Sequence, residues 1–307
     1  MLHIFVINPY AGDMTFANNL REKISKIPNL PYFIFNTRSV GYEGEIVGKI
    51  QHFFPDEQLR FYCCGGSGTI RNMLNGFESF ENVEIAYYPC GLTNDFLKVF
   101  GEEEKRFHNL EELVYGEVVD IDYIRTNHGV ALNTLSFGMD TDFNEKLKNW
   151  QILKAFGTSV PYVLAMLHAL VLTKSRTYEI QIGEETHLRE EAVTEFFYGN
   201  GYMLGGFLHF DDKADIQDGM GLCRYLRERS GLGNIPIAKA LATNDQKKLA
   251  SYAQIETQFC SKMRIRRKDG SPFGLSFDGE MVYGITDCEA QMVKRGLHMV
   301  VPKGVRL

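Results

Sequence analysis

Segments typical of strands and of helices alternate along the first hundred residues, and this alternation limits the folds open to the chain more than any other feature. Short apolar runs predict strands, and they lie at 2–7, 31–35, 59–64 and 83–88. Between them, apolar residues recur at the spacing of one helical face at 16–27, 43–54 and 70–77. This order predicts a parallel sheet with helical crossovers, and such sheets bind ligands at the carboxyl ends of their strands.

The pattern changes after about residue 118, where strand-like runs become frequent and turn signals separate many of them. The runs lie at 118–124, 130–134, 177–183, 191–198, 221–225, 262–267 and 274–277. Helix-like stretches lie at 142–155, 160–172 and 235–252. We therefore predict an α/β plus β fold, with a parallel α/β domain at 1–120 and a β-rich, sandwich-like domain at 121–290.

Composition narrows the function classes. The chain has 307 residues, and its formal net charge of −6 argues against nucleic-acid binding, which calls for a basic face. The same charge argues against permanent electrostatic attachment to an anionic membrane. The six cysteines show no C-x-x-C spacing, no secretory signal is visible, and the apolar run at 160–173 is too short to cross a bilayer. We predict a cytoplasmic protein with reduced thiols.

A glycine-rich turn follows the third predicted strand, and it consists of Gly65, Gly66, Ser67, Gly68 and Thr69. Glycines let the backbone approach a ligand closely, and the free N–H groups at the start of the next helix suit a phosphate. No Gly-Lys-Ser/Thr follows at Walker spacing, and the glycines do not fit G-x-G-x-x-G. Taken alone, the run is also compatible with an ordinary tight loop.

This turn resembles the Gly-Gly-Asp-Gly-Thr signature of the diacylglycerol kinase and sphingosine kinase family, with Ser67 in place of the aspartate. That family shares its nucleotide-binding fold with NAD kinases. Further stretches resemble the family's motifs in the same order, and they lie at 8–12, 89–96, 133–140, 205–219 and 278–280. Leu92 replaces a motif threonine and Phe207 a motif glycine. The resemblance spans nearly the whole chain, and the ordered set of motifs is specific.

The resemblance implies ATP and Mg²⁺ as cofactors and assigns residues to them. The implied nucleotide contacts are Asn8, Thr37, Gly65, Gly66, Ser67, Gly68, Thr69, Thr93, Asn94 and Asp95. Glu280 is the implied catalytic proton acceptor, with Asp278 as its partner at the same turn, where two nearby carboxylates can raise the pKa of one. A structural Mg²⁺ would take the carboxylate of Asp218 and the carbonyls of Asp215 and Met220. The segment from about 291 to 307 is expected to return to the first domain.

The implied function is ATP-dependent phosphorylation of a lipid hydroxyl, with diacylglycerol, giving phosphatidic acid, as the first expectation. Such a lipid kinase would contact the membrane surface transiently, and a homodimer is left open.

Ser67 raises a second hypothesis, because a hydroxyl cannot replace a carboxylate as a metal anchor or base. Either Asp278 and Glu280 suffice, or another acid compensates, or the protein is a regulatory one that binds nucleotide without transfer. The candidate acids are Asp95, Asp140 and Asp142. A third hypothesis is a kinase of a soluble acceptor such as NAD.

Two further segments bear on the acceptor. In the run 160–173, Val163, Met166, Leu167 and Leu170 share one helical face, which could line a lipid groove. The interpretation we favour for this run is a core helix packed on the second sheet. The run 262–268 alternates basic and apolar residues, which is typical of a solvated sheet face. A secondary interpretation of that run is contact with anionic lipid headgroups.

Overall fold

The computed structural model describes residues 1–12, 15–91, 94–150, 152–153, 160–211, 214–228 and 231–307. Four parallel strands form its first part in the order β2-β1-β3-β4. They are β1 (Leu2–Ile7), β2 (Tyr32–Asn36), β3 (Leu59–Gly65) and β4 (Val83–Pro89). The crossovers contain α1 (Phe16–Ser25), α2 (Tyr42–Phe53) and α3 (Ser67–Leu74). The predicted alternation is confirmed, and β3 and β4 are buried along their whole length, where Arg60 of β3 pairs with Glu84 of β4 at 2.6 Å.

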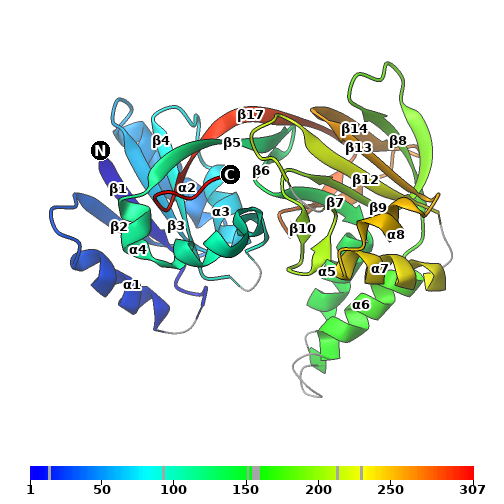
Figure 1. Cartoon of the computed structure of the whole chain (residues 1–307), viewed down its shortest axis with the longest axis horizontal. Coiled ribbons are helices and arrows are strands. Elements are labelled where there is room, and N and C mark those ends of the chain that lie inside the picture. Colours follow the sequence, from blue (N-terminus) through cyan, green and yellow to red (C-terminus); the bar gives the residue numbers. More distant parts are fainter. Residues whose placement is uncertain (13–14, 92–93, 151, 154–159, 212–213, 229–230) are drawn as a thin grey trace.

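A fifth strand joins this parallel part of the sheet, and it comes from the C-terminal end of the chain. Strand β17 (Asp287–Val301) pairs in parallel with β4 through His298–Val300, and it pairs antiparallel with β5 (Glu117–Thr126) along most of its length. Its first five residues, Asp287–Gln291, pair with β14 (Lys262–Arg267) of the second part. In Figure 1, β17 and β5 run side by side between the two lobes, and both termini lie at the left-hand lobe.

The second part is rich in antiparallel strands, as predicted, and its strands belong to the same hydrogen-bonded network, in the order β16-β15-β7-β9-β8-β14-β17. These strands are β7 (Thr134–Gly138), β8 (Arg176–Ile182), β9 (Arg189–Gly199), β15 (Phe273–Phe277) and β16 (Glu280–Ile285). Three more strands pair beside this path: β6 (Gly129–Ala131), β12 (Gly221–Arg227) and β13 (Ile255–Cys260). A separate hairpin joins β10 (Met203–Leu204) to β11 (Leu208–His209).

Helices of the second part gather at one end of its strands (Figure 1). They are α5 (Met139–Asn149), α6 (Val160–Leu172), α7 (Asn234–Ala242) and α8 (Gln246–Ala250). In the first part, the segment η1 (Asp95–His108) and α4 (Leu110–Val114) follow β4. Among the described residues, every helix is too short or too polar to span a bilayer.

Several element boundaries differ from the sequence-based prediction. The single helix expected at 235–252 is two helices, because Asn244 adopts a left-handed backbone with φ 52° between α7 and α8. The helix expected at 142–155 begins three residues earlier, at Met139, and α5 ends at Asn149. Strands β13, β16 and the long β17 were not predicted. The alternation of polar and apolar residues is irregular in β13 and β16, whereas the first six residues of β17 alternate regularly.

Candidate functional site

The glycine-rich turn sits where the first three strands of the parallel part end. Gly65 closes β3, Gly66 precedes α3 in extended conformation, and α3 begins at Ser67. A Cβ atom on Gly65 would lie 2.4 Å from Oγ1 of Thr69, so the turn requires glycine there. Asn8, directly after β1, donates a hydrogen bond from Nδ2 to that same Oγ1 at 3.0 Å. The first N–H groups of α3 therefore face a polar rim suited to an anion.

A cavity of about 910 Å³ opens in front of this turn. Its lining includes six of the residues predicted from sequence, and they are Asn8, Thr37, Gly66, Gly68, Thr69 and Glu280. Thr37 follows β2, its side chain is buried, and its N–H donates to the carbonyl of Ile7 at 2.9 Å. The predicted strand-end positions therefore converge on one cavity large enough for a nucleotide.

Glu280 joins this cavity from the other end of the chain. It begins β16, immediately after the turn at Asp278 and Gly279. A Cβ atom on Gly68 would lie 2.6 Å from its Oε1, so the carboxylate occupies the space that any side chain at 68 would need. A carboxylate from the second part is thus held against the first turn of α3, in the same cavity as the phosphate-binding backbone.

Asp278 is engaged by backbone groups. Its carboxylate accepts hydrogen bonds from the N–H groups of Leu132, Asn133 and Thr134, each at 2.8 Å. Burial raises the pKa of Asp278, and these three hydrogen bonds oppose the rise. The residue has a left-handed backbone with φ 51°, which aspartate tolerates better than most residues. Asp278 therefore ties the loop between β6 and β7 to the turn that presents Glu280.

Asp95 begins η1 and bonds to the second part, but it is not among the residues that line the large cavity. Its side chain is 9% exposed, Oδ2 accepts a hydrogen bond from the N–H of Gly205 at 2.7 Å, and Oδ1 has no partner. Burial raises the pKa of Asp95 to about 6. Asn94 precedes it in a left-handed backbone with φ 45° and donates from Nδ2 to the carbonyl of Gly91 at 2.9 Å. The predicted contact Thr93, like Leu92, lies outside the described residues.

The other acids proposed to compensate for Ser67 are already bonded. Ser136 and Asn144 donate to the two oxygens of Asp140 at 2.7 and 3.1 Å, and Thr173 donates to Asp142 at 2.8 Å. Ser67 itself shares a hydrogen bond with Tyr87, a buried residue whose hydroxyl donates to Asn94 at 2.9 Å. Of the three candidate acids, Asp95 is the one with a buried carboxylate oxygen that has no hydrogen-bond partner.

The residues predicted to hold a structural Mg²⁺ lie in the segment before β12. Asp215, Asp218 and Met220 line one small cavity of about 20 Å³, which is large enough for a single water-sized occupant. Burial raises the pKa of Asp218, and the nearby charge of Asp215 adds to that rise. Two carboxylates with backbone carbonyls are the hard oxygen ligands that Mg²⁺ prefers. No group of three acidic, histidine or cysteine side chains suited to a metal occurs within the described ranges.

A second, apolar cavity of about 80 Å³ lies beside Gly205, the residue bonded to Asp95. Tyr162, Met166 and Leu170 of α6 contribute to its wall. On the adjoining side of that helix, apolar side chains are exposed to solvent, and they include Val163 (51%), Leu164 (41%) and Leu167 (50%). The favoured interpretation of this run as a core helix is therefore wrong for its outer face, where Val163, Leu164 and Leu167 are exposed, although Ala165 and Ala169 are buried.

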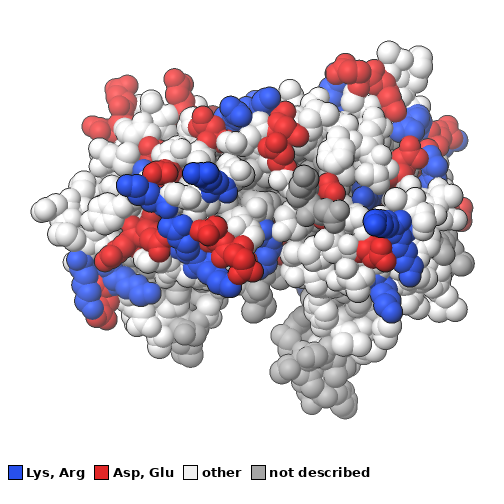
Figure 2. Space-filling model, in the orientation of Figure 1, with Lys and Arg blue, Asp and Glu red and all other residues white. Residues whose placement is uncertain are grey.

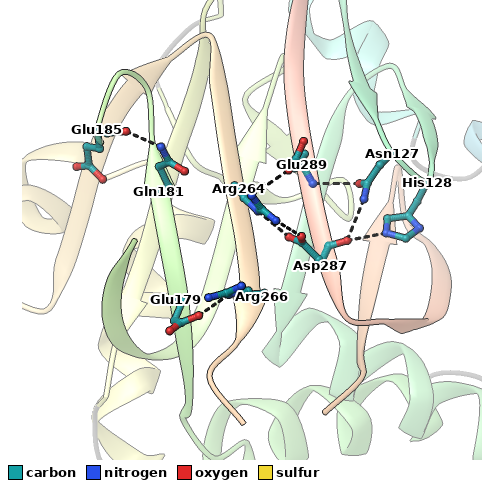
Figure 3. Close-up of polar contacts among 9 residues, drawn as sticks. All are labelled: Asn127, His128, Glu179, Gln181, Glu185, Arg264, Arg266, Asp287 and Glu289. Atoms are coloured by element: carbon teal, nitrogen blue, oxygen red, sulfur yellow. Dashed lines mark hydrogen bonds and ion pairs between the residues drawn. The ribbon is translucent and has the colours of Figure 1, made fainter. Parts of the chain in front are cut away.

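The basic strand β14 is neutralised by acids on its neighbours. Arg264 pairs with Asp287 at 2.5 Å and with Glu289 at 3.2 Å, and Arg266 pairs with Glu179 (Figure 3). Lys262 and Lys268 pair with Glu184 and Glu190. The strand is therefore a solvated sheet face with compensated charge, as we expected. On the face drawn in Figure 2, the coloured Lys and Arg side chains are likewise interspersed with Asp and Glu.

Some cavity residues were not predicted from the sequence. Glu43 and Asn72 line the large cavity together with Gly91, although no motif marks either of the first two. In sequence, a glutamate in the first turn of a helix looks like a solvent-exposed residue that favours the helix dipole. Only the packing of α2 against α3 turns Glu43 inward, where it is 2% exposed.

Comparisons with known proteins show which family and fold this chain resembles. Residues 3–126 match the family model "Diacylglycerol kinase catalytic domain". The chain is 23% identical over 308 residues to a diacylglycerol kinase of Bacillus subtilis (strain 168), covering 97% of this chain and 95% of that protein. It is 25% identical over 170 residues to a candidate lipid kinase of Staphylococcus aureus (strain JH9), so the chain spans about half the length of that relative (54%).

Solved structures show the same fold. A candidate diacylglycerol kinase from Bacillus anthracis strain Sterne superposes with a TM-score of 0.70 at 19% identity, covering 99% of this chain and 98% of that one. A diacylglycerol kinase structure from the same strain gives a TM-score of 0.65 at 16% identity, with the same coverage. The ordered motifs, the family model over residues 3–126 and the relative matched along nearly its whole length together show that this chain is similar to diacylglycerol kinases and related lipid kinases.

Proposed function

We propose that this protein transfers the γ-phosphate of ATP to the hydroxyl of a lipid, with diacylglycerol as the first acceptor to test. The observation that carries the proposal is the contact between Glu280 and Gly68, because it places a carboxylate beside the backbone that would bind phosphate. Phosphoryl transfer needs clamped phosphates, neutralised charge and a base near the acceptor hydroxyl. This site offers groups for each of these tasks.

In this proposal, the N–H groups at the start of α3 bind the phosphates, and Asn8 and Thr69 orient them from the rim. Mg²⁺, when bound with the nucleotide, would neutralise the charge of the phosphates. Glu280 accepts the proton of the acceptor hydroxyl, and Asp278 positions Glu280 by holding its turn. Asp95, whose Oδ1 is unpartnered, supplies the second negative charge that the turn lacks at Ser67.

The acceptor side supports a lipid more than a soluble molecule. The apolar cavity adjoins Gly205, which is bonded to Asp95, and helix α6 lines that cavity with one face. The other face of α6 exposes Val163, Leu164 and Leu167. A helix that is apolar on both sides is suited to touch a membrane surface and to guide an acyl chain. We propose transient membrane contact through this helix.

The proposed reaction is tested by offering Mg-ATP labelled in the γ-phosphate to mixed micelles of diacylglycerol, ceramide, sphingosine or undecaprenol, with NAD as a soluble acceptor. We expect label in a lipid product. Label in NAD would instead support the soluble-acceptor hypothesis. Binding of ATP without transfer to any acceptor would favour the regulatory hypothesis and place the loss of catalysis at Ser67.

The pH dependence of the reaction tests the role of Asp95. Because burial raises the pKa of Asp95 to about 6, its carboxyl becomes protonated and neutral as the pH falls through 6. We expect kcat/KM for Mg-ATP to fall below pH 6, by up to about tenfold per pH unit. Asp95→Asn should have low activity, and its kcat/KM should not fall further below pH 6. If kcat/KM of the variant still falls at the same pH, the titrating group is a residue other than Asp95.

A further inference from the structure

Glu43 is a buried acid that the proposed reaction does not use. It lies in the first turn of α2, its side chain is 2% exposed, and it lines the large cavity. Its Oε2 atom is buried without a hydrogen-bond partner. A buried carboxylate oxygen that lacks a partner is costly, so such a group in a binding cavity points to a ligand that donates a hydrogen bond to it.

The packing around Glu43 holds its carboxylate in place. Helix α2 lies so close to α3 that a Cβ atom on Gly76 would come within 2.2 Å of the Cα atom of Gly44. Burial raises the pKa of Glu43, and hydrogen bonds from the backbone of Glu43 and Gly41 and from the side chain of Asn72, on α3, oppose that rise. One side of the carboxylate is therefore occupied by the protein, while Oε2 remains free for a ligand.

The position of Glu43 identifies the part of a nucleotide that it meets. Its partner Asn72 lies five residues into α3, which is roughly 7 Å from the phosphate-binding start of the helix at 1.5 Å per residue. A carboxylate would repel phosphates, so they are expected at the helix start and the nucleoside beside Glu43. An ionised carboxylate only accepts hydrogen bonds. The exocyclic amine of adenine is a donor, whereas hypoxanthine and guanine present a carbonyl oxygen at the same ring position.

We propose that Glu43 accepts a hydrogen bond from the 6-amino group of adenine and makes the site select adenine over 6-oxo purines. This inference rests on the proposed function, in which the large cavity binds a nucleotide. It makes Glu43 a specificity-determining residue that acts on the nucleoside end of the site, away from the reacting phosphate. A 6-oxo purine held in the same pose would place its O6 against the carboxylate, and it would have to shift to offer its N1–H instead, which weakens its binding.

The test is equilibrium binding of ATP, ITP, GTP, 2′-deoxy-ATP and 3′-deoxy-ATP by calorimetry, with and without Mg²⁺. We expect the wild-type protein to bind ATP about 10–100-fold more tightly than ITP, the size of a hydrogen bond to a charged group. Glu43→Gln, which also carries a donor, should reduce this ratio to within a fewfold of one. Glu45→Gln is the matched control, because Glu45 is an exposed residue of the same helix and pairs with Lys49. That control should keep the wild-type ratio.

Each contrary outcome has a distinct meaning. Equal affinity of the wild-type protein for ATP and ITP would overturn the inference and leave the proposed function standing. If Glu43→Gln weakens ATP but not the deoxy-nucleotides, the carboxylate binds the ribose and the inference is wrong. If Glu43→Gln weakens ATP only when Mg²⁺ is present, the carboxylate serves the metal, and the inference is again wrong. Failure of all five nucleotides to bind would overturn the proposed function together with the inference.

Discussion

Replacing Glu280 by glutamine is expected to lower kcat of lipid phosphorylation by about 10²–10³-fold or more. The amide keeps the shape of the side chain, including its fit against Gly68, but it can neither accept a proton nor supply a negative charge. Because Glu280 is exposed in the absence of ligand, the variant should fold as well as the wild type. Steady-state transfer of labelled phosphate, with ATP affinity measured separately, checks this expectation.

The comparison variant for Glu280→Gln is Glu57→Gln, which removes an equally exposed carboxylate outside the cavity and should leave kcat unchanged. A fall in ATP affinity with little change in kcat would show that Glu280 binds the nucleotide and that another group accepts the proton. Asp95 would then be the next residue to test, since one oxygen of its buried carboxyl has no hydrogen-bond partner.

Replacing Asp278 by alanine is expected to destabilise the protein by about 3 kcal/mol or more, because it leaves three backbone N–H groups without their acceptor. Alanine also fits poorly at a φ of 51°. Asp278→Asn keeps one acceptor oxygen and tolerates that backbone, so its loss of stability should be smaller. Urea unfolding followed by circular dichroism measures both variants.

The control for Asp278→Ala is Asp269→Ala, which removes another aspartate that caps a turn, at an exposed position bonded to Ser271. Its free energy of unfolding should change by less than about 1 kcal/mol. Equal stability of Asp278→Ala and the wild type would contradict the structural role of this carboxylate. A stable Asp278→Ala variant with low kcat would instead make Asp278 a participant in the reaction.

The local elements of the first part could be predicted from sequence because their cause is local. Apolar runs such as 59–64 and helical periodicity such as that of 43–54 correspond to β3 and α2 within about two residues. The glycine-rich turn could also be located from the sequence. The structure explains its glycine at 65, because a side chain there would clash with Thr69. The split between α7 and α8 was missed, because a single left-handed residue, Asn244, leaves the apolar periodicity unchanged.

The sequence by itself determined the parallel α/β start of the chain, the β-rich second part and the ordered motifs of a lipid kinase family. Tertiary structure alone decided which distant residues meet. Glu280 reaches Gly68 because β17 crosses between the lobes and pairs with both β14 and β4. Glu43 faces the cavity because two glycines let α2 and α3 approach closely. Such contacts depend on packing and long-range strand pairing, which no local pattern of residues records.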